Sequence, residues 1–110
     1  MKQYVIDEIR PADHAKLKAY LDEHFHVPGF EGLYHLPMEK DLLSDLQKDH
    51  DDCAPHYFAL ELLPDRLSCE LLVRTSQRVR CDCIQYANQE QQCWLIREVD
   101  VLLESLEIIT

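Results

Sequence analysis

Glycine is scarce in this chain of 110 residues, since only Gly29 and Gly32 occur and both lie in one short segment. A phosphate-binding loop and the turn that carries a hydrolase nucleophile both require glycines at a different spacing. The sequence therefore argues against nucleotide binding and against serine-hydrolase chemistry. Because proline and glycine gather at residues 27–32, this connection is predicted to be the most flexible loop of the chain.

Long apolar runs are also missing. The first eight residues contain no run that fits the apolar part of a signal peptide, and no segment approaches the length of a membrane span. These absences predict a cytoplasmic location, where the five cysteines should be mostly reduced. Their odd number also excludes a complete set of disulfides within the chain.

Basic residues are few: 11 are set against 21 acidic ones, which gives a net charge of −10. Such a field repels nucleic-acid phosphates and anionic membranes, so neither is an expected partner. The charge is compatible with a basic partner, which leaves a role as an acidic chaperone or adaptor open.

Residues 57–86 predict a three-stranded antiparallel meander. Apolar residues alternate with other residues from Phe58 to Leu62, as in a strand with one buried face. Pro64 and Asp65 favour a turn. Pairing across this turn sets Leu62 opposite Leu67, and then matches the pairs Leu60–Cys69 and Phe58–Leu71.

Two loop lengths are possible before the third strand, and each gives that strand a different register. An even loop would bury Arg80 and Asp82, whose charges would lack partners. We therefore favour an odd loop. It brings three pairs together, which are Val79 with Val73, Cys81 with Leu71, and Cys83 with Cys69.

The flanking segments predict strands and helices that complete the domain. An apolar run at 4–9 suits an edge strand, a helix should run from Pro11 to about His24–His26, and 33–36 should be extended. A second helix is expected to open at Pro37. Asn88, with Gln91 three residues on, predicts a capped final helix. The chain is thus expected to form one α+β domain, 1–110, in which the sheet packs against about three helices.

Histidines and cysteines suggest a metal site. Imidazoles and thiolates are good zinc ligands, and the strand bearing Cys81 and Cys83 could bring sulfur to the segment 50–56. The spacing is not that of a zinc finger, and buried cysteines often serve only as small apolar groups. The candidate ligands are His50, Cys53, His56, Cys81 and Cys83.

Thiol redox chemistry is a weaker hypothesis. In the favoured register Cys69 and Cys83 lie near disulfide distance. Reactive thiols, however, need exposure and a nearby positive charge, which a core beneath helices does not offer. Cys93, near the start of the last helix, is expected to pack one turn from Ile96.

The outer face of the meander should carry apolar side chains beside charged ones, which favours either a covering helix or a second subunit. We expect a homodimer. The leading functional hypothesis is a non-enzymatic interaction or structural module, with a zinc-binding or thiol-dependent protein as the alternative. The candidate interaction residues are Arg74, Arg78, Arg80, Leu72, Ile84 and Tyr86.

Overall fold

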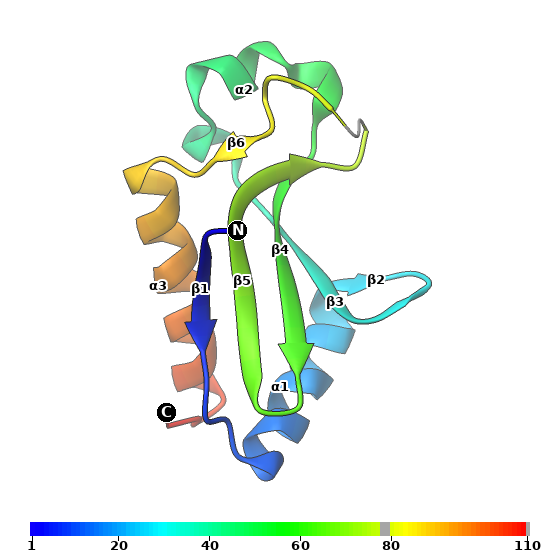
Figure 1. The fold of residues 1–110 in the computed structure, drawn as a ribbon, viewed down its shortest axis with the longest axis vertical. Helices are drawn as coiled ribbons and strands as arrows, with labels where there is room; N and C mark the ends of the chain where they lie inside the picture. Colours follow the sequence, from blue (N-terminus) through cyan, green and yellow to red (C-terminus); the bar gives the residue numbers. More distant parts are fainter. Residues whose placement is uncertain (78–79, 110) are drawn as a thin grey trace.

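The computed structural model describes residues 1–77 and 80–109 and shows an antiparallel sheet packed against helices (Figure 1). Its strands follow the order β1-β5-β4-β3-β2, and β6 pairs with the same edge of β5 that β1 uses. The predicted α+β class is confirmed. The elements are β1 (Gln3–Ile6), α1 (Pro11–His24), β2 (His26–Val27), β3 (Phe30–Pro37), the 3₁₀ helix η1 (Lys40–Leu42), α2 (Asp45–Asp49), the 3₁₀ helix η2 (Asp51–Cys53), β4 (His56–Leu63), β5 (Arg66–Thr75), β6 (Gln85–Tyr86) and α3 (Gln89–Ser105).

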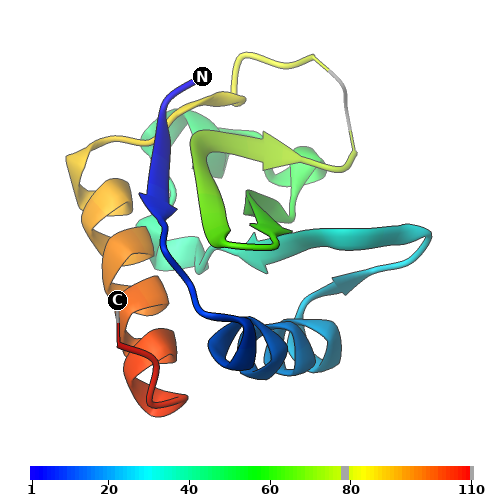
Figure 2. The same cartoon turned by 60° about the horizontal axis from the view of Figure 1, so that its bottom comes forward.

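The β4–β5 hairpin has the predicted register only near its turn. Leu62 lies opposite Leu67 and Leu60 opposite Cys69, as expected. Beyond Cys69 the register shifts, so Phe58 lies opposite Val73 and the prediction that it faces Leu71 is wrong. The bulge adds residues to β5 and accompanies its marked bend in Figure 2.

The third strand is much shorter than expected. Of its residues that the structure describes, only Gln85 and Tyr86 pair with β5, opposite Val73 and Leu72. The predicted pairings of Cys81 with Leu71 and of Cys83 with Cys69 are wrong, because β1 occupies that part of the β5 edge. Residues 80–84 therefore lie outside the sheet, and the predicted partner Val79 falls outside the described residues.

The first and last helices agree with the sequence. α1 begins at Pro11 and ends at His24, where the two-residue strand β2 follows. The Asn88 side chain accepts a hydrogen bond from the backbone N–H of Gln91, and the Gln91 side chain accepts one from the backbone N–H of Asn88. This reciprocal cap starts α3 as predicted.

The predicted helix opening at Pro37 is wrong. Pro37 instead ends β3, an eight-residue strand that contains the predicted extended piece. The predicted helix is interrupted at Leu43, whose backbone is extended. Ser44 then starts a separate helix, α2, through a second capping box with Gln47. Two short helical pieces therefore replace one longer helix at this end of the sheet.

The core lies between the sheet and the helices α1 and α3, which sit on one of its faces (Figures 1 and 2). Phe58 is fully buried, and its ring stacks at 6.1 Å from that of Trp94. Leu17 and Leu21 of α1 and Leu95 of α3 are equally buried. In the described part of the chain, no helix is long and apolar enough to cross a membrane.

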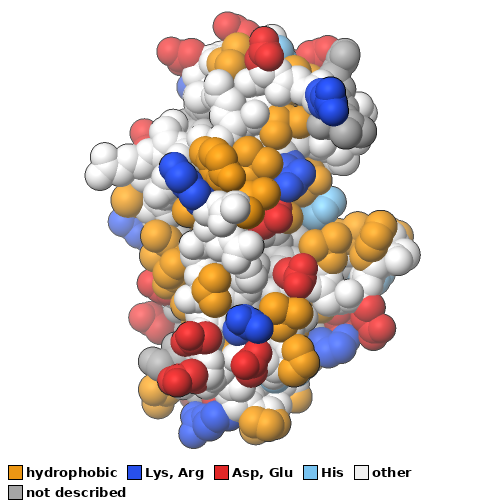
Figure 3. All heavy atoms as spheres, in the orientation of Figure 1, with side chains coloured by type: hydrophobic (Ala, Val, Ile, Leu, Met, Phe, Trp, Pro, Cys, Tyr) orange, Lys and Arg blue, Asp and Glu red, His pale blue; other side chains and the backbone are white. Residues whose placement is uncertain are grey.

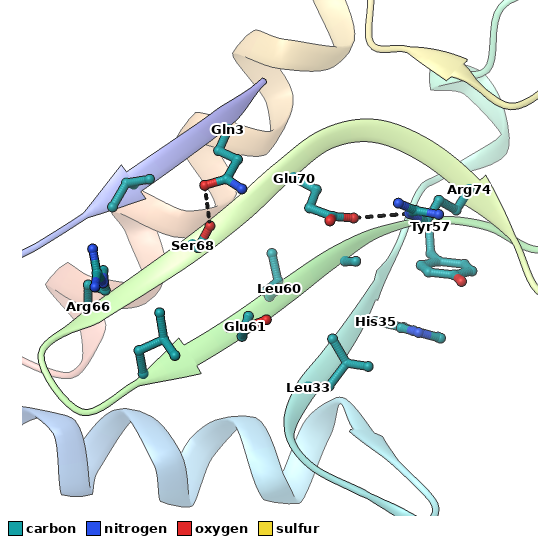
Figure 4. A pocket seen from close by; sticks show the side chains of 13 residues that line it. Gln3, Leu33, His35, Tyr57, Leu60, Glu61, Arg66, Ser68, Glu70 and Arg74 are labelled. Carbon is teal, nitrogen blue, oxygen red and sulfur yellow. Dashed lines mark hydrogen bonds and ion pairs between the residues drawn. The ribbon is translucent and has the colours of Figure 1, made fainter. Parts of the chain in front are cut away.

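The opposite face of the sheet is not covered by any helix of the described residues. Hydrophobic, acidic and basic side chains alternate over it (Figure 3). A hollow of about 450 Å³ lies on this face, where Glu70 accepts a hydrogen bond from Arg74 at 3.0 Å and the rings of His35 and Tyr57 stack at 3.7 Å (Figure 4). Leu63 also lines the hollow.

Candidate metal centre

Four of the five predicted ligands meet at one end of the sheet. His50 and Cys53 come from the end of α2 and from η2, whereas Cys81 and Cys83 come from the segment before β6. One ligand atom from each residue lies within 4.8 Å of the others. Segments about thirty residues apart in the chain thus supply one nitrogen and three sulfurs to a single cluster, which we call the Cys/His cluster.

The interatomic distances are close to those of a tetrahedral zinc site. The sulfurs of Cys53 and Cys81 are 3.7 Å apart, and a tetrahedron with zinc–sulfur bonds of about 2.3 Å has sulfur–sulfur edges of roughly 3.8 Å. Nδ1 of His50 lies 3.0 Å from the Cys81 sulfur. This contact is shorter than a tetrahedral nitrogen–sulfur edge of roughly 3.6 Å, so an ion would require the imidazole to shift by about half an ångström.

Local helical geometry places His50 and Cys53 together. α2 ends at Asp49, and the next residue, His50, caps it by donating its backbone N–H to the carbonyl of Gln47 at 3.1 Å. The next turn is a 3₁₀ helix in which the N–H of Cys53 donates to the carbonyl of His50 at 2.9 Å. In a 3₁₀ turn, side chains three residues apart lie above one another. The three-residue spacing therefore directs both side chains toward the same point.

Two buried glutamines hold the segment that carries Cys81 and Cys83. The Nε2 group of Gln47 donates to the carbonyl of Cys83 at 3.2 Å, and the Nε2 group of Gln91 donates to Oε1 of Gln47 at 2.9 Å. Both glutamines are 1% exposed, and each is the third residue of a capped helix. The starts of α2 and α3 are thereby joined beside Cys83.

The three thiols have different acidities. A hydrogen bond from the backbone N–H of Cys83 is the main cause that lowers the pKa of Cys81 to about 7, with smaller contributions from the neighbouring side chains. Burial raises the pKa of Cys83 to about 12 and also raises the pKa of Cys53. Cys81 is therefore the most acidic of the three thiols, and metal binding would release protons from cysteines that are still protonated.

His56, the fifth predicted ligand, is not part of the Cys/His cluster. It is 2% exposed, and its two ring nitrogens have no hydrogen-bond partner among the described residues. In β4 it is spaced by two residues from Phe58 and by four from Leu60, so it shares their buried face. Burial, with a smaller effect from His50, lowers the pKa of His56, so the neutral imidazole is the favoured form in the folded chain.

We expect His56 to make the metal-free protein less stable in mild acid. The unfolded chain binds a proton near the ordinary histidine pKa of about 6.5, whereas folded His56 binds one only at lower pH. The free energy of unfolding is therefore highest at pH values above about 6.5 and declines as the pH falls below it. In urea titrations between pH 7.5 and pH 5, His56→Leu should reduce this decline.

His56→Leu leaves His35 unchanged, and since burial also lowers the pKa of His35, part of the decline should remain. The variant should bind zinc like the wild type because His56 is not among the four grouped ligands. An unchanged decline between pH 7.5 and pH 5 would contradict this account of His56.

The remaining thiols lie apart from the cluster. Cys69 is fully buried between Tyr4 of β1 and Leu60 of β4, and burial raises its pKa to about 12. The predicted Cys69–Cys83 pair is therefore not formed. Cys93 is exposed on α3, contrary to the expectation that it packs.

The described members of the predicted interaction set lie at several places in the structure. Arg74 lies on the open sheet face with Glu70, Arg80 is exposed beside Cys81, and Arg78 lies outside the described residues. Tyr86 is 44% exposed and lies opposite the half-buried Leu72, and the ammonium group of Lys2 stands 5.3 Å from the centre of the Tyr86 ring. Ile84 is half-buried next to the Cys/His cluster.

The supporting role of Gln47 was not predicted from the sequence. The segment Ser44-Asp45-Leu46-Gln47 has the capping-box pattern that was recognised at Asn88, and it could have located the start of α2. No local signal indicates that the two capping-box glutamines meet, because that contact depends on the tertiary fold.

Comparison with known protein families, curated proteins and solved structures finds no match to this chain.

Proposed function

We propose that this chain is a small zinc-binding domain in which His50, Cys53, Cys81 and Cys83 hold the ion. The observation that carries the proposal is the convergence of one imidazole nitrogen and three sulfurs within 4.8 Å. Thiolate and imidazole ligands in a tetrahedral arrangement favour zinc over magnesium or calcium. Four protein ligands also close the coordination shell, which is typical of structural rather than catalytic zinc.

The proposed ion would connect two segments that the sheet does not join. His50 and Cys53 follow α2, and the segment 80–84 leads into β6 and α3. Both sides already contact through the bond from Gln47 to Cys83. Because a metal that binds only the folded chain adds its binding energy to folding, zinc would stabilise this end of the domain.

Elemental analysis tests the proposal. Protein purified without chelator, or refolded with zinc under reducing conditions, should contain about one zinc per chain. Cys53→Ser and Cys83→Ser should lose it. Cys93→Ser, which changes an exposed thiol outside the cluster, should retain it. Wild-type protein that takes up no zinc after such refolding would contradict the proposal.

A second candidate function is self-association through the open sheet face. The hollow on this face is lined by two arginines, Arg66 and Arg74, and two glutamates, Glu61 and Glu70, whereas the whole chain carries a net charge of −10. Two copies repel each other least where the local charge is balanced. Half-buried apolar residues on the same face, including Leu33 and Leu63, favour contact with another protein surface.

We expect dimer formation to increase with ionic strength, because salt screens the repulsion between two acidic chains. Sedimentation velocity at low and high salt measures the effect. Val5→Glu, on the face, should weaken the dimer, while Val101→Glu, at an exposed position of α3, should not. A monomer at every salt concentration would contradict self-association, and binding of a basic protein that weakens with salt would favour the adaptor hypothesis instead.

A further inference from the structure

Cys81 is the accessible thiol of the Cys/His cluster. It is half-exposed, whereas Cys53 and Cys83 are 1% and 0% exposed. A surface hollow of about 400 Å³ opens beside Cys81 and is also lined by Arg80, Asp82 and Ile84. A small solute that enters this hollow therefore meets the Cys81 sulfur before it meets either of the other two.

A second thiol lies within reach of Cys81. The sulfur of Cys53 is 3.7 Å away, and a disulfide of about 2.05 Å requires the two atoms to approach by less than 2 Å. Cys83 is a poorer partner for two reasons. It is separated from Cys81 by a single residue, and its carbonyl is held by Gln47. Cys53 and Cys81 are thus the pair that oxidation should join.

We propose that Cys81 is a site of oxidation by hydroperoxides, that Cys53 resolves the product as a disulfide, and that this disulfide releases the bound zinc. The release of zinc rests on the proposed function. The formation of the disulfide rests only on the positions of the two sulfurs and on the hollow beside Cys81.

The chemistry is balanced with hydrogen peroxide as the oxidant. The Cys81 thiolate attacks one peroxide oxygen, the O–O bond breaks, and hydroxide leaves and takes up a proton to become water. The Cys81 sulfur, oxidised by two electrons, is now a sulfenic acid. The Cys53 thiolate attacks this sulfur, the S–O bond breaks, and a second water leaves. Two thiols and one peroxide give one disulfide and two waters.

Zinc release follows from the loss of ligands. Thiolates bind zinc well, and sulfur in a disulfide no longer carries the charge that makes it a ligand. Oxidation would remove two of the four proposed ligands at once and leave His50 and Cys83. A two-ligand site holds zinc far more weakly than a closed tetrahedral one. Reduction of the disulfide would restore the site.

The experiment treats zinc-loaded wild-type protein with hydrogen peroxide and measures released zinc with a colorimetric chelator. Peptide mapping under non-reducing conditions then identifies the disulfide. We expect zinc and the Cys53–Cys81 disulfide to appear in equal amounts, and dithiothreitol to restore zinc binding. In metal-free Cys53→Ala, where the resolving thiol is missing, a dimedone adduct should accumulate on Cys81.

The outcomes separate this inference from the proposed function. Zinc content before peroxide tests the function alone. If zinc is bound, three results would overturn the inference: peroxide that leaves zinc in place, zinc release without a disulfide, or a disulfide that involves Cys83. Cys93→Ser protein should behave like the wild type, since Cys93 is an exposed thiol on α3 outside the cluster.

Discussion

Zinc should raise the thermal unfolding midpoint of the metal-free protein by more than about 10 °C. A ligand that binds only the folded chain, at a concentration one thousand times its dissociation constant, stabilises by about 4 kcal/mol. For a domain of this size each kcal/mol raises the midpoint by roughly 4 °C. The effect is expected because the proposed ion would join the segment after α2 to the segment before β6. Differential scanning calorimetry with and without zinc measures it.

The variants that test this shift differ in one thiol each. Cys53→Ser and Cys83→Ser remove a proposed ligand and should lose most of the shift. Cys93→Ser changes an exposed thiol and should keep it. A shift of similar size in all three variants would show that zinc acts elsewhere on the chain.

Phe58→Ala should lower the free energy of unfolding by about 3–5 kcal/mol, the range for removing a buried aromatic side chain. Phe58 is fully buried and stacks on Trp94, so its ring connects β4 to α3. It also lies at the β-bulge, opposite Val73. Because neighbouring backbone strands hold their positions, the cavity should collapse only in part.

Urea denaturation of the metal-free protein measures this loss, and Phe30→Ala is the matched control. Phe30 is 59% exposed, so its truncation should change stability by no more than about 0.5 kcal/mol. Equal effects of the two substitutions would contradict the described core. The comparison tests the packing of the sheet on α3 independently of any metal.

The β4–β5 turn could be predicted because its determinants are local. Pro64 and Asp65 specify the turn, and the apolar alternation then fixes the pairing of Leu60 with Cys69. The apolar alternation from Phe58 to Leu62 does not predict the bulge beyond Cys69. The short third strand depends on β1, which competes for the same edge of β5 from the other end of the chain. Local periodicity does not report such competition.

The candidate site was predicted in composition but not in geometry. Cys81 and Cys83 were expected to share a strand face, yet both lie in a segment outside the sheet, where His50 and Cys53 are in reach. His56 was included as an imidazole of the segment 50–56. The strand β4 begins at His56 and places its imidazole with the buried face instead. The residue types thus predicted that histidines and cysteines would form a cluster. Which of them belong to it depends on the path of the backbone.

X-ray absorption at the zinc edge of the zinc-loaded protein tests the central claim most directly. The Cys/His cluster predicts three sulfur neighbours at about 2.3 Å and one nitrogen neighbour at roughly 2.0–2.1 Å. A first shell made only of nitrogen and oxygen atoms would contradict a metal centre formed by His50, Cys53, Cys81 and Cys83.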